Sequence, residues 1–282
     1  MTFDFDGARE IVRTALAEDL RYGPDATTEA TVPGGAIAEA GFNTREAGVL
    51  AGLPLVRLVL DEVLGADSYQ VLDERTDGDR LAPGDCALRV KAPVRGLLTA
   101  ERTALNLVTH LSGIATATSR WVDAVDGTGC RIRDSRKTLP GLRDLQKYAV
   151  RCGGGVNHRM ALGDAILIKD NHVVAAGSAA AAVRACRAHA PDLPMEVEVG
   201  DLDELEEVLA EDVSLVLLDN FTPDQCAEAV SRTRTTSPGT ELEASGGLTL
   251  DVARAYADTG VHYLAVGALT HSSPSLDLGL DM

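Results

Sequence analysis

The stretch AILIKD, residues 165–170, has the pattern of a short buried strand that ends in a charged residue. Runs of the same kind occur at five other places from residue 130 onward: CRIRD (130–134), MEVEVG (195–200), SLVLLDN (214–220), ELEASGG (241–247) and YLAVGA (263–268). Helical patterns lie between most of them. Strands that alternate with helices predict βαβ units, and therefore a parallel sheet in this part of the chain.

Polar residues or glycines recur at the carboxyl end of each predicted strand. They are Asp134 to Lys137, Lys169, Glu198, Asp219, Ser245 and Gly267. A (β/α) barrel builds its active site from the carboxyl ends of all its strands, whereas an open doubly wound sheet gathers the site at one switch point. The recurrence therefore favours a barrel. Six clear strands are fewer than the eight of a complete barrel.

The part before residue 98 has a different pattern. It predicts helices over 6–20 and 53–65. Short alternating segments, bounded by Gly, Pro and Asp, lie at 36–42, 48–53, 69–74 and 86–92. We expect an α+β sandwich with an antiparallel sheet here.

A long helix is predicted over 98–125, with Thr99 as its N-cap, and it joins the two halves. Arg102 would then lie in the first turn, where a cation is mildly unfavourable. Either Glu101 offsets this charge or Arg102 serves a site elsewhere.

Composition excludes several classes of protein. The chain has 43 acidic and 26 basic residues, a net charge of −17, which argues against nucleic acid or an anionic membrane as the main partner. Its five cysteines are scattered, without a Cys-x-x-Cys pair, so we expect reduced thiols and a cytoplasmic protein. We find no signal peptide and no apolar run of membrane-spanning length.

Window 131–169 is basic despite this acidity. It carries nine Lys or Arg and three Asp, a balance of +6. Lys169 ends an apolar strand, where a free ammonium is costly, so it needs an anion, either Asp170 or a ligand. Three of the cations lie four residues apart and predict a solvated helix face: Arg143, Lys147 and Arg151.

The motif RDSRKTLPG (133–141) places Arg136 and Lys137 in the loop after a predicted strand, where barrel sites are built. The alternative is a local salt bridge between Asp134 and Arg136. The glycine run of CGGGVNHR (152–159) exceeds what a helix cap needs and would let the backbone approach a ligand. It matches no dinucleotide or Walker motif.

Carboxylates follow two adjacent strands. Glu196 and Glu198 alternate with valines, so both face the same side of their strand, and Asp219 ends an apolar run. Glu198 and Asp219 could hold magnesium or sugar hydroxyls, or either could pair with Lys169. Arg133, inside its strand, is expected to pair with an acid such as Glu198 or Asp219.

Small residues follow the last two strands. SGG (245–247) and VGALTHS (266–272) supply backbone N–H groups and hydroxyls, as in barrels that bind phosphate after their late strands. The residues alone therefore predict a site for an anionic, phosphorylated ligand.

The chain resembles the quinolinate phosphoribosyltransferase family along nearly its whole length. The resemblance is carried by AEDLRYGPDATTEA, ERTALNLVTHLSGIAT, EVEVG, LLDNF, EASGGLTL and YLAVGALTHS, and above all by RDSRKTLPGLRDLQKYAVRCGGGVNHRMALGDAILIKDNH. Ser135 departs from the family, which more often has threonine there. The resemblance implies an N-terminal α/β sandwich and an incomplete α/β barrel of about seven strands, the type II phosphoribosyltransferase fold. We expect domains at 1–112 and 113–272, with the tail 273–282 returning to the first.

The resemblance also implies roles for individual residues. Quinolinate would be bound by Ser135, Arg136, His158, Arg159 and Lys169, with Arg102 donated by the partner subunit of a homodimer. Phosphoribosyl pyrophosphate would be bound by Lys137, Lys169, Glu198, Asp219, Ser245, Gly246, Gly247, Gly267 and His271. The catalytic residues would be Lys137, Glu198 and Asp219, and the last two would hold Mg²⁺ directly or through water.

The implied reaction converts quinolinate and phosphoribosyl pyrophosphate to nicotinate mononucleotide, pyrophosphate and carbon dioxide, with magnesium, in de novo NAD synthesis. Two alternatives stay open: a related phosphoribosyltransferase with another acceptor, such as the paralogue of molybdenum-transport operons, and a barrel that binds a phosphorylated ligand without catalysis. Assembly beyond a dimer is also left open.

Overall fold

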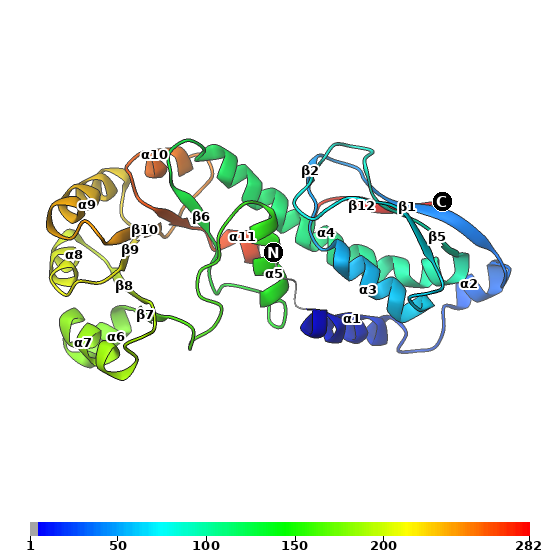
Figure 1. The fold of residues 1–282 in the computed structure, drawn as a ribbon, viewed down its shortest axis with the longest axis horizontal. Coiled ribbons are helices and arrows are strands. Elements are labelled where there is room, and N and C mark those ends of the chain that lie inside the picture. Colours follow the sequence, from blue (N-terminus) through cyan, green and yellow to red (C-terminus); the bar gives the residue numbers. More distant parts are fainter. Residues whose placement is uncertain (1–4) are drawn as a thin grey trace. The chain divides into compact units, whose positions relative to one another are not determined.

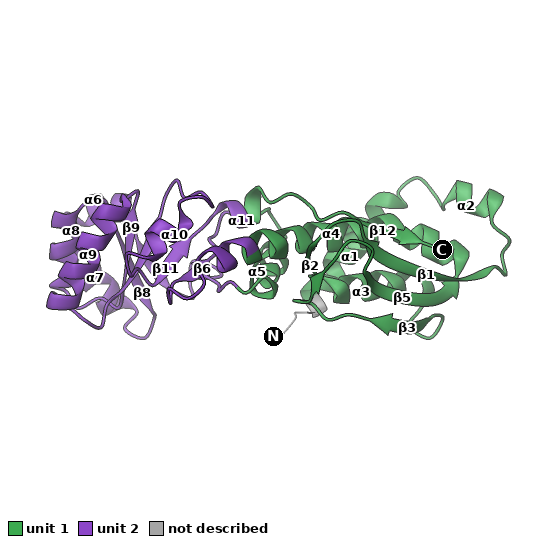
Figure 2. Cartoon of the chain, turned by 90° about the horizontal axis from the view of Figure 1, so that it is seen from above, with its two compact units in different colours: residues 1–119, 138–154, 270–282 green, residues 120–137, 155–269 purple. Residues whose placement is uncertain are grey.

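The structure, a computed structural model, describes residues 5–282, with side chains from Gly7 onward (Figure 1). The chain divides into two compact units, coloured separately in Figure 2: unit 1 is residues 1–119, 138–154 and 270–282, and unit 2 is residues 120–137 and 155–269. The boundary expected at residue 112 lies inside helix α4 (Val94–Ala124), which contributes residues to both units.

Unit 1 contains the antiparallel sheet that the alternating segments predicted. Its order is β12-β1-β5-β3. The strands are β1 (Ile37–Thr44), β3 (Gln70–Glu74), β5 (Cys86–Pro93) and β12 (Leu278–Asp281). Because β12 pairs with β1, the end of the chain completes a sheet formed by its beginning. A separate two-stranded ribbon joins β2 (Gly48–Val49) and β4 (Arg80–Leu81).

The helices of unit 1, besides its part of α4, are α1 (Phe5–Asp19), α2 (Ala26–Thr31), α3 (Leu53–Leu64) and α5 (Arg143–Cys152). Helix α3 is apolar on most sides and contacts both α1 and β5. Its first N–H groups are satisfied by the Asp77 carboxylate, which accepts from Gly52 at 2.8 Å and from Leu53 at 3.0 Å. Asp77 also accepts from the Tyr148 hydroxyl, which links α5 to this helix start.

The start of α4 differs from the prediction. Strand β5 runs directly into the helix at Val94, so Thr99 lies inside the helix and its hydroxyl donates to the Arg95 carbonyl. The prediction that Thr99 is the N-cap is therefore wrong. Arg102 lies beyond the first turn, so the helix terminus does not disfavour its charge.

Gly113 gives a testable consequence of the packing of unit 1. A Cβ at this position would lie 2.0 Å from the Pro274 carbonyl oxygen, because the C-terminal segment crosses α4 in direct backbone contact. Gly113→Ala is expected to lower the free energy of unfolding by about 1–3 kcal/mol. Chemical denaturation measures this, with Gly35→Ala as control, since nothing lies within 4 Å of a Cβ at Gly35. Equal stability of the two variants would contradict this packing.

The predicted solvated face of α5 is wrong for Lys147. This side chain is fully buried, whereas Arg143 and Arg151 are half-buried. The helix buries most of its surface, including Leu145, Tyr148 and Val150. The spacing of four residues between these cations correctly indicated one face of a helix, but that face is largely buried rather than exposed to solvent.

Unit 2 contains a six-stranded parallel sheet in the order β6-β11-β10-β9-β8-β7. Its strands are the six predicted ones: β6 (Arg131–Arg133), β7 (Ile166–Ile168), β8 (Met195–Val199), β9 (Leu215–Asp219), β10 (Glu241–Ser245) and β11 (Tyr263–Ala265). The segment after Gly155 extends the edge at β6, where the Val156 N–H donates to Ile132 and its carbonyl accepts from Asp134. This short seventh segment agrees with an incomplete barrel of about seven strands.

Helices cover the outer side of this sheet (Figure 1). They are α6 (Asp170–Ala176), α7 (Ala179–His189), α8 (Leu202–Leu209), α9 (Pro223–Thr236) and α10 (Ala253–Ala257); the short α11 (Ala268–His271) follows β11. Alternate strand residues point outward and are buried and aliphatic, as Val197, Val216 and Leu264 illustrate. The other set points inward. Among the described residues, no helix has the length and apolarity needed to cross a membrane.

Candidate active site

The carboxyl ends of the central strands gather charged side chains at one edge of the sheet. Lys169 follows β7, and its ammonium forms an ion pair with the Glu198 carboxylate on the neighbouring β8. Asp170 is exposed and accepts from a backbone N–H instead. The anion that Lys169 needs is therefore Glu198. The Lys169 side chain remains 45% exposed, so a ligand can still reach it.

The register places Asp219 beside this pair. Val199 of β8 is opposite Leu218 of β9, and Asp219 is opposite Ser245 of β10. Asp219 is half-buried, and its carboxylate accepts from Asn220 Nδ2 at 2.9 Å. Glu198, Asp219 and Ser245 thus end adjacent strands, as expected from their positions in the sequence.

The turn after β10 requires glycine. Gly246 has φ 94° and Gly247 has φ 59°, conformations that residues with a side chain rarely adopt. A Cβ at Gly246 would also lie 2.2 Å from Asn220 Oδ1. The turn is therefore packed against Asn220 at Gly246, whereas nothing lies within 4 Å of a Cβ at Gly247. The phosphate contact expected at 245–247 stays a prediction.

The loop after β6 is fixed by hydrogen bonds. The buried Asp134 carboxylate accepts from the Asn157 amide and, at 2.9 Å, from the His158 N–H. Ser135 Oγ accepts from the Lys137 N–H at 3.1 Å. The alternative salt bridge between Asp134 and Arg136 does not form.

Arg136 and Arg159 are two half-buried cations without a carboxylate partner among residues 7–282. The Nε atoms of both are buried and make no hydrogen bond, and Arg159 Nη1 donates only to the Ala165 carbonyl, at 3.0 Å. Burial, followed by the charge of Arg136, lowers the pKa of Arg159. Two guanidinium groups that repel each other in a partly buried place favour a bound anion.

Two of the candidate residues belong to unit 1. Arg102 is exposed on α4, and its side chain has no hydrogen bond or ion pair within the described part of the chain. His271 ends α11, is exposed, and its Nδ1 lies 2.5 Å from Ser272 Oγ. The rest of the set lies in unit 2: Ser135, Arg136, Lys137, His158, Arg159, Lys169, Glu198, Asp219, Ser245, Gly246, Gly247 and Gly267.

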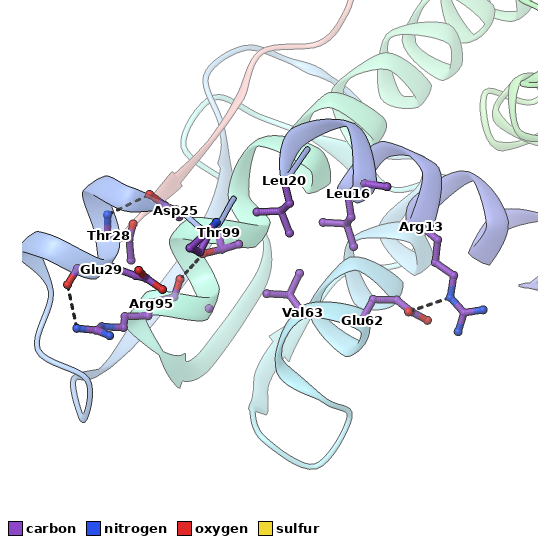
Figure 3. Close-up of a pocket in the computed structure, with 13 residues that line it drawn as sticks. Arg13, Leu16, Leu20, Asp25, Thr28, Glu29, Glu62, Val63, Arg95 and Thr99 are labelled. Atoms are coloured by element: carbon purple, nitrogen blue, oxygen red, sulfur yellow. Dashed lines mark hydrogen bonds and ion pairs between the residues drawn. The ribbon is translucent and has the colours of Figure 1, made fainter. Parts of the chain in front are cut away.

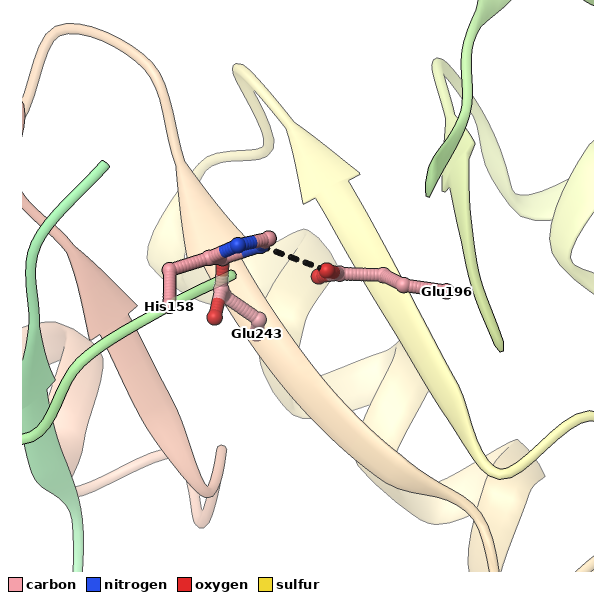
Figure 4. A group of neighbouring side chains, drawn as sticks. All are labelled: His158, Glu196 and Glu243. Carbon is pink, nitrogen blue, oxygen red and sulfur yellow. Dashed lines mark hydrogen bonds and ion pairs between the residues drawn. The ribbon is translucent and has the colours of Figure 1, made fainter. Parts of the chain in front are cut away.

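Below the strand ends, the inward side chains form a buried ionic network. His158 Nε2 lies 2.6 Å from Glu196 Oε2 on β8 and 3.8 Å from Glu243 Oε1 on β10 (Figure 4). Arg133 pairs with Glu243 at 2.8 Å and lies over the Tyr263 ring at 4.3 Å. Burial, followed by the charge of Glu196, raises the pKa of Glu243 to about 7. The prediction that Arg133 pairs with Glu198 or Asp219 is wrong.

A cavity of about 220 Å³ lies at the start of β7 to β10. Its polar lining comes from Arg133, His158, Arg159, Glu196, Ser214 and Glu241. It therefore opens onto the ionic network from the amino-terminal ends of the strands.

A larger cavity, of about 540 Å³, lies within unit 1 between α1, α3 and the start of α4 (Figure 3). Several of its charged residues already have partners: Glu62 pairs with Arg13 at 3.0 Å, and Arg95 donates to the Val32 carbonyl at 2.7 Å. It contains none of the candidate site residues.

Comparison with known families agrees with this arrangement. The model of the quinolinate phosphoribosyl transferase C-terminal domain matches residues 114–281, and that of the N-terminal domain matches residues 25–112. The chain belongs to the quinolinate phosphoribosyltransferase family. The resemblance seen in the sequence is thereby confirmed.

Relatives of this phosphoribosyltransferase match it along almost its full length. A nicotinate-nucleotide pyrophosphorylase (carboxylating) of Mycobacterium leprae is 60% identical over 279 residues, covering 99% of this chain and 98% of that protein. The human protein of the same name is 35% identical, covering 96% and 90%. The solved nicotinate-nucleotide pyrophosphorylase of Francisella tularensis superposes with a TM-score of 0.93 at 37% identity, covering 99% and 97%.

Sequence reasoning missed the role of Asp134, which it named only as a strand-end residue and a possible partner of Arg136, and it missed Glu243 altogether. Asp134 holds the segment after Gly155, and Glu243 holds Arg133. The signal for Glu243 was present in ELEAS (241–245), where glutamates alternate with apolar residues as in MEVEV. No comparable signal distinguishes Asp134 from a solvated loop aspartate.

Proposed function

We propose that this phosphoribosyltransferase transfers the phosphoribosyl group of phosphoribosyl pyrophosphate to quinolinate and releases pyrophosphate and carbon dioxide. The product is nicotinate mononucleotide, which belongs to de novo NAD synthesis. Family membership and the names of its full-length relatives support the reaction. One observation supports quinolinate as the acceptor substrate. Arg136 and Arg159 are two half-buried guanidiniums without a carboxylate partner among the described residues.

Quinolinate suits these cations because it carries two adjacent carboxylates. Planar guanidiniums bind carboxylates through two parallel hydrogen bonds, which fixes the acceptor ring as well as its charge. Lys169 supplies a third cation once an acceptor carboxylate competes with Glu198 for its ammonium. Ser135 adds a hydroxyl at the same loop.

Glu198 and Asp219 are the residues that would hold Mg²⁺ and the ribose hydroxyls. The fit is chemical: both are partly exposed carboxylates on adjacent strands, and Mg²⁺ takes oxygen ligands from one or two carboxylates together with substrate phosphates. When bound, the ion would neutralise charge on the departing pyrophosphate. We place the 5′-phosphate at the turn 245–247 and Gly267, where glycines let a phosphate approach the backbone.

The bond changes follow from the acceptor. The pyridine nitrogen forms a bond to C1 of the ribose while the bond from C1 to pyrophosphate breaks. The electron pair of the broken bond leaves with pyrophosphate. Glu198 and Asp219 stabilise the positive charge that develops at C1, and Lys137 stabilises the leaving group. The resulting pyridinium accepts the electron pair left when the 2-carboxylate departs as carbon dioxide, and a proton from solvent replaces it.

We also propose that the enzyme is a cytoplasmic homodimer. Five free cysteines without a disulfide support a reducing compartment. The exposed and unpaired Arg102 supports an exchange of one cation between subunits.

Subunit mixing tests this exchange. Arg102→Ala and Arg136→Ala are each expected to be nearly inactive. In a mixed dimer one site receives an intact Arg136 from its own subunit and an intact Arg102 from the partner, while the other site loses both. Random mixing in equal amounts should therefore restore about a quarter of wild-type activity, because about half of the dimers are mixed and each has one intact site. No recovery, although mass spectrometry detects mixed dimers, would contradict the exchange.

The acceptor itself is tested by a steady-state comparison of quinolinate with nicotinate, each with phosphoribosyl pyrophosphate and magnesium. We expect nicotinate mononucleotide from quinolinate alone, because nicotinate lacks the second carboxylate. Turnover of nicotinate without turnover of quinolinate would assign another acceptor. Binding of both substrates without formation of any product would show that the protein is a barrel that binds its ligands without catalysis.

A further inference from the structure

We infer that Glu196 is a positioning residue for the acceptor end of the site, and that it acts through His158 on Arg159 rather than by touching a substrate. The inference rests on the proposed function only where it is tested by enzyme kinetics. The carrying observation is a continuous hydrogen-bonded connection from inside the barrel to the backbone of Arg159. Figure 4 shows its first link, between Glu196 and His158.

The two ring nitrogens of His158 are both used within the protein. The Arg159 N–H donates to Nδ1 at 2.7 Å, so Nδ1 is an acceptor and carries no proton. The ring proton is therefore on Nε2, where it donates to Glu196 Oε2 at 2.6 Å. Both ring nitrogens of His158 thus have partners within the protein.

The connection fixes the segment that carries Arg159. From one side Asp134 accepts the His158 backbone N–H at 2.9 Å, and from the other Glu196 holds the His158 ring. The ring in turn accepts from the Arg159 N–H, so the backbone on the amino side of the Arg159 Cα is fixed. The Glu196 and His158 side chains are only 5% and 10% exposed, which excludes competition by bulk water.

One imidazole and two carboxylates lie close together here, which is a composition also found in metal sites. His158, Glu196 and Glu243 each offer one ligand atom within 4.8 Å of the others. However, a histidine that ligates a metal through one nitrogen normally donates from its other ring nitrogen, whereas here Nδ1 accepts. Glu243 is also paired with Arg133 at 2.8 Å. The geometry is therefore that of a hydrogen-bonded and ion-paired network rather than that of a metal site.

Two substitutions of Glu196 separate positioning from charge. Glu196→Gln keeps an oxygen that accepts from Nε2, so the quinolinate KM should rise by no more than about threefold. Glu196→Leu fills the space without an acceptor, and the quinolinate KM should rise about 10- to 100-fold. The KM for phosphoribosyl pyrophosphate should stay within about twofold of wild type in both. Glu207→Gln, an exposed glutamate on α8, is the matched control and should change neither constant.

A folded Glu196→Leu chain with an unchanged quinolinate KM would overturn the inference, and so would equal losses for both substrates. Nitrogen-15 NMR of histidine-labelled wild-type chain provides a test that does not depend on activity or on folding of the variant. The expected spectrum shows the Nε2–H tautomer of His158, assigned by its loss in His158→Asn, both before and after addition of quinolinate. A doubly protonated ring in either state would overturn the inference, whereas absence of turnover with wild type would overturn the proposed function alone.

Discussion

Arg136→Ala is expected to lower kcat/KM for quinolinate on the order of 10²- to 10³-fold, mainly through KM. Removing one guanidinium leaves a carboxylate of the acceptor without its bidentate partner in a partly buried place. The other guanidinium, that of Arg159, cannot replace it, because its own Nη1 is directed at the Ala165 carbonyl. Steady-state kinetics with each substrate varied in turn measures the effect.

The matched variants decide whether charge or geometry is lost. Arg136→Lys keeps the charge but not the planar pair of donors, so its loss should be smaller than that of the alanine variant yet still measurable. Arg184→Ala removes an exposed arginine that pairs with Glu211 on the surface of unit 2, and activity should be unchanged. If Arg136→Ala raised the KM of phosphoribosyl pyrophosphate instead, Arg136 would bind the other substrate.

Asp219→Asn is expected to lower kcat on the order of 10²- to 10³-fold while the quinolinate KM changes little. The amide occupies the same space, so the register of β9 with β10 is retained, but the negative charge beside C1 of the ribose is lost. The variant should also need more magnesium for half-maximal rate, since one carboxylate of the proposed pair is gone. Rates measured across a magnesium titration test both statements.

Asp224→Asn supplies the control for this charge change. Asp224 is exposed in the first turn of α9, in the same unit, and its substitution should leave kcat and the magnesium dependence as in wild type. An Asp219→Asn enzyme with wild-type kcat would remove Asp219 from the catalytic residues.

Periodicity predicted the framework of the fold well, because apolar strands and amphipathic helices differ in period. All six strands of the parallel sheet were expected within a few residues of their observed bounds, including AILIKD around β7. The register then follows from the parallel pairing, so Glu198, Asp219 and Ser245 could be expected together at the strand ends. The family resemblance was required to name the acceptor.

Partner choice inside the barrel could not be predicted, because it depends on strand order. Arg133 on β6 reaches Glu243 on β10 because β11 pairs with both strands, although β6 is the first and β11 the last strand of the parallel sheet along the sequence. Lys147 was predicted as a solvated cation because a spacing of four cannot distinguish a helix face in water from one in the core. Thr99 was predicted as a cap because nothing in the sequence marks the continuous passage from β5 into α4.

Release of labelled carbon dioxide tests the central claim most directly. Quinolinate labelled in the 2-carboxylate is incubated with the full chain, phosphoribosyl pyrophosphate and magnesium, and carbon dioxide, pyrophosphate and nicotinate mononucleotide are measured together. The account predicts that the three products appear in equal amounts, and only when both substrates are present. Pyrophosphate released without labelled carbon dioxide, or no product from quinolinate at all, would contradict it.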